Sequence, residues 1–94
     1  MTIYSKTKTS YYRRLYVAYL IDSGVNTAPL LIEKAGMPKR TLQDTLVALS
    51  ELDILLEKEG GTKNLTYQIS DWGAINKKWI ENNLQNVKGV LQLT

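Results

Sequence analysis

The stretch that decides the fold of this chain runs from residue 34 to residue 55 and reads KAGMPKRTLQDTLVALSELDIL. Gly36 and Pro38 mark a tight turn, because glycine accepts a left-handed backbone and proline favours the first turn of a helix. The spacing of the side chains after this turn predicts an amphipathic helix over 38–52, with one stripe facing a core. The stripe consists of Leu42, Thr45, Leu46, Leu49 and Leu52.

A shorter helix is predicted directly before the turn. Thr27 is a suitable N-cap, Pro29 is tolerated in the first helical turn, and Gly36 follows the last helical residue. Because only about three residues separate the two helices, we expect them to cross at a steep angle instead of lying antiparallel. Together they would form a helix-turn-helix over 27–53.

A first helix is predicted over residues 8–23, and its central run LYVAYLI (15–21) is apolar on every side. The β-branched and aromatic residues of this run would also suit a strand. The flanking polar residues extend the segment to the length of a helix, which favours the helical interpretation. A helix this apolar is expected to be surrounded by protein, either of its own domain or of a partner subunit.

A hairpin and a last helix are predicted after the leucine stripe. The runs 54–59 and 65–70 are strand-like, and the GGTKN sequence between them holds residues that accept positive φ in a hairpin loop. Ser70 or Asp71 is then expected to cap a single C-terminal helix over 71–88.

This order of elements resembles that of the winged helix-turn-helix superfamily of bacterial DNA-binding regulators. Its members typically show a capped short helix, a tight turn, an Arg-Thr start to the recognition helix, and leucines that lead through an apolar step into the wing. In this chain the matching positions are Thr27, Ala35-Gly36-Met37-Pro38, Arg40-Thr41, Leu42/Leu46/Leu49 and Leu52-Asp53-Ile54-Leu55. Family members often have a glycine in the apolar step, where this chain has Asp53-Ile54. The sequence ISDWG (69–73) looks like the exit from the wing.

The resemblance implies an α+β, mostly helical fold in a single domain over 1–94. That fold has a three-helix core, a two-stranded β-hairpin wing over 54–70 and a C-terminal helix. It also implies that the helix over 38–52 is the recognition helix of a DNA-binding protein.

Composition narrows the chemistry that the chain can perform. Cysteine and histidine are both absent, which removes disulfides, thiolate chemistry, the usual zinc sites and the commonest general base. The nine carboxylates are scattered singly, so we expect neither an enzyme nor a bound metal or cofactor. No apolar run is long enough to span a membrane and the N-terminus lacks a signal core, so a cytoplasmic bacterial protein is expected.

Charge is distributed unevenly around a net value of +3. Residues 1–14 carry four cations and no acid. A basic N-terminal arm over 1–10 could be drawn to phosphate, or it could simply be solvated. Residues 27–53, in contrast, hold four acids and three cations.

The outward face of the 38–52 helix is the predicted reader of double-stranded DNA, because the major groove admits one α-helix. Lys39 or Arg40 can donate to guanine or clamp phosphate, Gln43 can pair with adenine, and Asp44 can accept from cytosine. Further backbone or minor-groove contacts are expected from the wing tip and the first helix. The full predicted set is Lys39, Arg40, Thr41, Gln43, Asp44, Lys58, Lys63, Arg13 and Arg14.

The predicted function is sequence-specific DNA binding by a small transcriptional regulator that acts as a homodimer. A second apolar stripe on the last helix is surplus to the core and suggests a partner helix. It consists of Ile80, Leu84, Val87 and Leu91. The alternative is a winged-helix adaptor that binds a protein partner and reads no DNA, which the acidic balance of 27–53 and the apolar surplus also fit.

Overall fold

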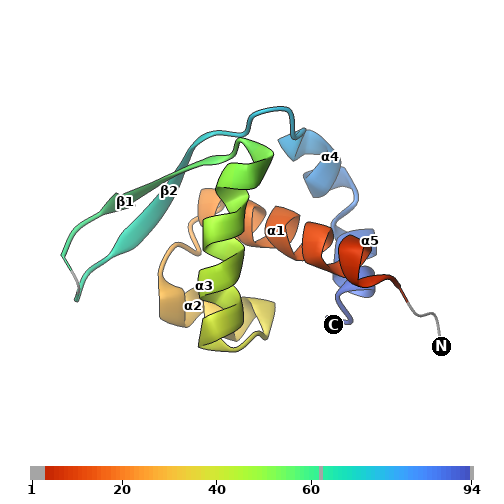
Figure 1. Cartoon of the computed structure of the whole chain (residues 1–94), viewed down its shortest axis with the longest axis horizontal. Helices are drawn as coiled ribbons and strands as arrows, with labels where there is room; N and C mark the ends of the chain where they lie inside the picture. The colour runs from red at the N-terminus through yellow and green to blue at the C-terminus, as the bar shows by residue number, and fades with distance from the viewer. Residues whose placement is uncertain (1–3, 62, 94) are drawn as a thin grey trace.

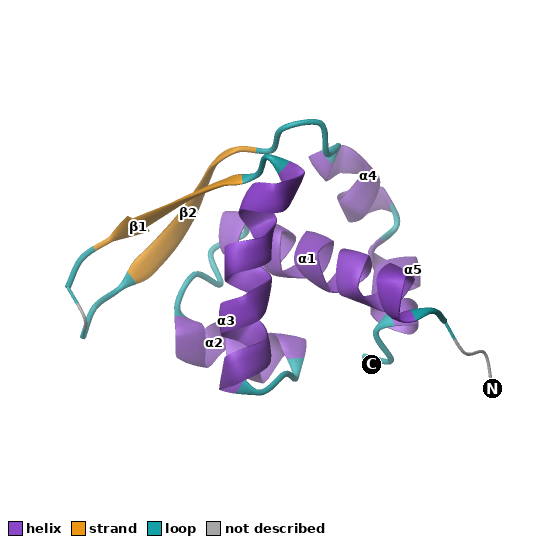
Figure 2. Cartoon of the chain, viewed as in Figure 1, coloured by secondary structure: helices purple, strands orange, loops and turns teal. Residues whose placement is uncertain are grey.

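The computed structural model of the chain describes residues 4–61 and 63–93. Three helices are followed by a hairpin and two short helices (Figures 1 and 2), which is the α+β, mostly helical arrangement predicted from the sequence. The elements are α1 (Lys6–Asp22), α2 (Ala28–Ala35), α3 (Lys39–Ala48), the 3₁₀ turn η1 (Leu49–Leu52), β1 (Leu55–Glu59), β2 (Thr66–Asp71), α4 (Lys77–Asn82) and α5 (Leu84–Val90).

Helix α1 lies at the centre of the molecule. It packs against α2, α3, α4, α5 and β2, and every residue over 15–21 except Tyr19 is buried. In Figure 1, α3 crosses in front of α1, the hairpin projects to one side, and the start of α1 and helix α5 lie on the other. The prediction that a helix over this run is surrounded by protein is therefore confirmed.

The start of α1 differs from the prediction. The Ser5 hydroxyl caps the helix by accepting the Lys8 N–H at 3.1 Å, so α1 begins at Lys6. Residues 6–10, predicted as part of a basic arm, are thus the first turns of this helix. The arm's first three residues lie outside the described part of the chain.

Helices α2 and α3 form the predicted helix-turn-helix. Gly36 ends α2 in a left-handed conformation, with φ at 63°, and its N–H donates to the Ile32 carbonyl. Thr27 occupies the N-cap of α2, but its side chain makes no capping hydrogen bond. The predicted stripe of α3 and η1 is buried, with Leu52 only partly covered. The Thr45 hydroxyl within it donates to the Thr41 carbonyl at 2.7 Å.

The hairpin begins at a residue with an unusual backbone. Asp53 adopts φ of 60°, the left-handed conformation that a glycine would accept more readily, and a short polar side chain tolerates it. This turn sends Ile54 into the core, where it is fully buried. Strands β1 and β2 then pair antiparallel, with an irregularity between Leu55 and Leu56. Buried Tyr67 fastens the hairpin to the loop before α2, because its N–H donates to the Asn26 carbonyl at 2.9 Å.

The single C-terminal helix predicted over 71–88 is wrong, because the structure has two short helices there. The Asp71 carboxylate accepts the Gly73 N–H at 2.7 Å and so turns the chain instead of capping a helix. Asn76 is the N-cap of α4 in its place. Asn83, between α4 and α5, leaves helical geometry with φ of −121°. Asparagine favours helix ends because its side chain competes for backbone hydrogen bonds.

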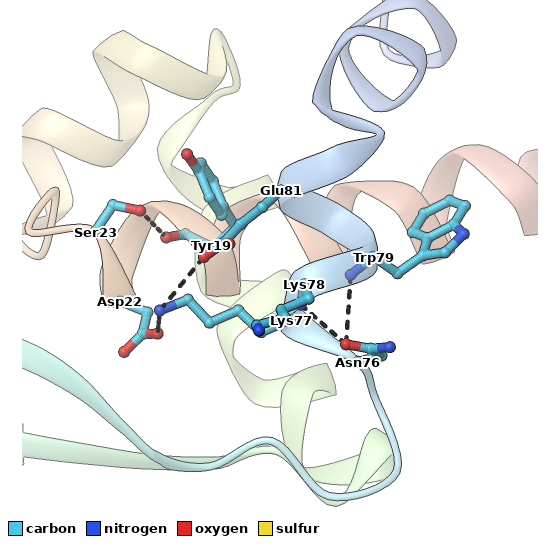
Figure 3. A network of polar contacts seen from close by, with 8 residues as sticks. All are labelled: Tyr19, Asp22, Ser23, Asn76, Lys77, Lys78, Trp79 and Glu81. Atoms are coloured by element: carbon cyan, nitrogen blue, oxygen red, sulfur yellow. Dashed lines mark hydrogen bonds and ion pairs between the residues drawn. The ribbon is translucent and has the colours of Figure 1, made fainter.

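An ion pair fastens α4 to the end of α1. The Lys77 ammonium contacts the Asp22 carboxylate and lies 3.7 Å from Glu81 (Figure 3). The hydrogen bond to Asp22 is the main reason why the pKa of Lys77 is raised above its ordinary value. Beside it, the Ser23 hydroxyl donates to the Tyr19 carbonyl and closes the last turn of α1.

We expect Gly73→Ala to destabilise the protein. Gly73 has φ of 61°, and a Cβ there would lie 2.7 Å from the Asp53 carbonyl oxygen. The left-handed conformation alone costs an alanine about 1–2 kcal/mol, so the free energy of unfolding in urea should fall by at least that amount. The matched control is Gly89→Ala within α5, where a Cβ meets nothing and the free energy of unfolding should rise by up to about 1 kcal/mol. Equal effects of the two changes would contradict the assigned turn.

The Lys77–Asp22 contact should show in the pH dependence of stability. A raised lysine pKa means that the contact stabilises the fold below the ordinary pKa of 10.5 and that this contribution is lost as the pH rises through the raised pKa. Lys77→Gln should therefore lower the Tm modestly at pH 7, and its difference from wild type should shrink at alkaline pH. Lys78→Gln removes the same charge from an exposed neighbour and should leave the Tm almost unchanged at both pH values.

Candidate nucleic-acid interface

The face of α3 opposite its leucine stripe is open to solvent. Lys39, Arg40, Gln43 and Asp44 are all exposed there, as predicted, whereas Thr41 is partly buried. Burial of the stripe accounts for this arrangement, because residues three and four apart share one side of a helix. The face thus combines two cationic hydrogen-bond donors with an amide and a carboxylate.

The N-terminal end of α3 is electropositive. Pro38 occupies the N-cap and supplies no side-chain hydrogen bond, and the first turn contains no acidic residue. The unpaired N–H groups of a helix start carry partial positive charge, and here Lys39 and Arg40 add two full charges. This end of α3 would attract a phosphate or the acceptor atoms of a base.

Tertiary packing brings two predicted residues of α1 alongside α3. Arg13 and Arg14 line a shallow depression between the two helices, together with Thr41 and Asp44 of α3. Within the described residues, neither arginine forms an ion pair with a carboxylate, even though Asp44 lines the same depression. Both guanidinium groups are therefore free to contact an anion held against α3.

Ser10 belongs to the same depression and is missing from the predicted set. It lies three and four residues before Arg13 and Arg14, so the three side chains share one side of α1. This spacing in the sequence could have predicted that Ser10 lies beside the two arginines. Lys6 and Thr7 continue this polar side toward the start of α1, next to Ser10 and Arg14.

The wing is mixed in charge. Lys58 and Lys63 are exposed, as predicted, but Lys58 lies between the exposed acids Glu57 and Glu59. Glu59 also accepts a hydrogen bond from the Gln68 amide at 3.4 Å. The wing can touch phosphate only through isolated cations, so it adds less electrostatic attraction than the α1 side of α3.

The structure places the predicted dimer stripe mainly inside one chain. Ile80 and Val87 are fully buried, and Leu84 and Leu91 are partly buried against the core. A dimer built on these four residues would have to displace packing that already exists. The dimer itself stays a prediction.

An aromatic groove on the other side of α1 holds the exposed apolar side chains of this region. Trp79 is 41% exposed, and its ring meets that of Tyr12 edge-on at 6.2 Å. Figure 3 shows the Trp79 ring pointing away from the Lys77–Asp22 contact. Sequence patterns did not predict the groove, because its walls come from segments about sixty residues apart along the chain. It is lined by Tyr11, Tyr12, Leu15, Ala74, Ile75, Asn76, Trp79 and Ile80.

Residues 4–61 and 63–93 contain no group of three or more acidic side chains placed to hold a metal ion. These residues also contain no helix that is both long enough and apolar enough to cross a membrane.

We expect Ile80→Ala to lower the free energy of unfolding by about 2–5 kcal/mol, because it leaves a cavity in the core of the single chain. The loss should be the same at low and high protein concentration, as measured by urea denaturation. Leu30→Ala, at an exposed apolar position, is the control and should change stability by no more than about 0.5 kcal/mol. A loss that grows with protein concentration would place Ile80 at a subunit interface instead.

Known proteins support the same arrangement. The chain is similar to the crystal structure of a DUF2131 family protein from Shewanella amazonensis SB2B, with 30% sequence identity, a TM-score of 0.88 and coverage of 96% of each chain. Among the curated proteins, none matches the sequence significantly. A sequence profile described as winged helix-turn helix matches residues 6–91, which span all eight elements from α1 to α5. The chain therefore belongs to the winged helix-turn-helix family.

Proposed function

We propose that this protein binds double-stranded DNA sequence-specifically, as a small bacterial transcriptional regulator with α3 in the major groove. The observation that carries the proposal is the exposed face of α3, where Lys39, Arg40, Gln43 and Asp44 surround an electropositive helix start. In a family whose fold is suited to DNA binding, such a face has the chemistry that base edges require.

Each side chain has a role that follows from its chemistry. Arg40 donates to guanine O6 and N7, Gln43 pairs with adenine, and Asp44 accepts from the cytosine amino group. Lys39 contacts phosphate at the helix start. These roles give selectivity, but the acid in the set weakens attraction to the DNA backbone.

Most of the backbone attraction comes from α1. Arg13 and Arg14 lie beside α3 without protein ion-pair partners among the described residues, so they can each neutralise one phosphate at the edge of the groove. Lys58 and Lys63 add weaker contacts, because acids flank the first of them. The protein thus binds DNA with modest affinity and reads it through α3.

The proposed regulator acts as a homodimer on two half-sites about 34–36 Å apart. Two-fold symmetry in the protein would appear as a palindrome in the DNA that it selects. The sites recovered from a random duplex pool therefore report on both sequence reading and symmetry.

A second candidate function is that of an adaptor for a protein partner. The aromatic groove around Trp79 favours it, because exposed tryptophan and tyrosine are enriched at protein interfaces. The groove uses Tyr11, Tyr12 and Leu15 of α1, whereas the depression beside α3 uses Ser10, Arg13 and Arg14, so the two functions rely on different side chains. Failure to bind any duplex at low salt would favour the adaptor.

We expect fluorescence anisotropy with mixed duplex DNA to show binding that weakens with salt along a straight log–log line. Lys39→Ala should reduce the slope of that line by about one, since it removes one phosphate contact. Arg40→Ala and Gln43→Ala should instead alter the sequences recovered from random duplex. An unchanged sequence preference would overturn their base-reading role.

The matched control for these variants is Lys78→Ala. It removes the same charge as Lys39→Ala from an exposed position on α4. The salt slope of this variant should remain that of wild type. A flat salt dependence of the wild-type protein itself would contradict DNA binding as its function.

A further inference from the structure

Val47 is an apolar residue on the otherwise polar, solvent-exposed face of α3 that we propose reads DNA. It is 71% exposed, the highest value among the exposed large hydrophobic side chains of the described residues. It is also absent from the core cluster and from the partly buried residues packed on that cluster. Every neighbour on the same face is polar or charged.

Val47 lies on the same side of α3 as the proposed base readers, near the C-terminal end of the helix. It follows Asp44 by three residues, Gln43 by four and Arg40 by seven, spacings that keep all four side chains on one side of a helix. An apolar side chain in this position would enter the groove together with the three proposed base readers.

Folding does not account for a valine in this position. An exposed helical site favours alanine or an unbranched side chain, since valine loses side-chain freedom in a helix. Val47 buries little surface in return. Its contribution must therefore be sought in what the face contacts.

The major groove offers one apolar group, the C5-methyl of thymine. A β-branched side chain has a single strongly preferred rotamer in a helix, so the two methyl groups of Val47 are held in place before DNA arrives. Valine has no hydrogen-bonding group and cannot satisfy the donors and acceptors of the other bases. Its chemistry selects thymine over them.

We propose that Val47 reads a thymine in the target by packing against its C5-methyl group. This inference rests on the proposed DNA-binding function and extends it to the base recognised. The thymine lies beside the bases read by Gln43 and Asp44, toward the C-terminal end of α3. The target half-site therefore contains a thymine whose methyl group contributes to affinity.

The test removes the thymine methyl group from one side of the contact and the two valine methyl groups from the other side, singly and together. A preferred duplex is first selected from a random pool, and each of its thymines is then replaced singly by uracil, which lacks only that methyl. Binding is measured by anisotropy for wild type and for Val47→Ala. For wild type, each half-site should contain one thymine whose single replacement weakens binding about fourfold, as expected for one buried methyl group.

The two changes should not add. For Val47→Ala, uracil at that thymine should bind as well as thymine does. Leu55→Ala is the control, since it truncates an exposed aliphatic side chain at the start of β1, outside α3. This control should keep the fourfold loss at the same thymine.

The possible results distinguish failure of the thymine contact from failure of the proposed DNA-binding function. Selective binding in which Val47→Ala and uracil act additively at every thymine would overturn the role of Val47 and leave DNA reading intact. Absence of any duplex preference in the wild-type protein would overturn the proposed function, and the thymine contact with it. Loss of the uracil effect at one position in Val47→Ala alone would support the inference.

Discussion

The contact between the leucine stripe of α3 and the apolar run of α1 is the interaction on which the other features depend. Leu42 and Leu49 on one side and Val17 on the other are completely buried. Because α1 also contacts both C-terminal helices and the second strand, the whole molecule assembles around this one helix. Once the stripe faces inward, the opposite face of α3 must be exposed, and no packing requirement acts on its side chains.

That freedom is visible in the charges of α3. Two cations at a helix start oppose the helix dipole at a cost of about 0.3–1 kcal/mol each. The buried leucines can outweigh this cost, since a fully buried leucine contributes about 1.5–3 kcal/mol. A surface that is slightly unfavourable for the helix is therefore tolerated, and this is expected when the surface is kept for a ligand.

Affinity and selectivity are divided between two helices in the proposed function. The face of α3 carries an acid and an exposed valine, which discriminate among bases but attract no phosphate. Arg13 and Arg14 compensate from α1, since neither forms an ion pair among the described residues even though Asp44 lines the same depression. The aromatic groove lies on the other side of α1 and leaves this arrangement undisturbed.

Local sequence patterns predicted the central fold well and the ends of the chain poorly. The stripe, the Gly36 turn and the hairpin depend on neighbours within a few residues, so their signals survive in the sequence. The prediction for the C-terminal region was wrong because Asn76 caps the start of α4 and Asn83 caps its end. Hydrophobic spacing alone does not reveal such helix boundaries. Residues 6–10 of the predicted arm are helical, because the Ser5 side chain caps α1, which begins two residues before the predicted start of the helix.

The sequence by itself determined which side of α3 faces solvent, and with it the exposure of Lys39, Arg40, Gln43 and Asp44, because helical periodicity is a local property. Only the tertiary structure decided that Arg13 and Arg14 lie beside Thr41 and Asp44, and that Ile80 and Val87 are fully buried within the single chain. Both arrangements bring together segments that are far apart along the chain. They follow from how whole helices pack against α1, which no short stretch of sequence specifies.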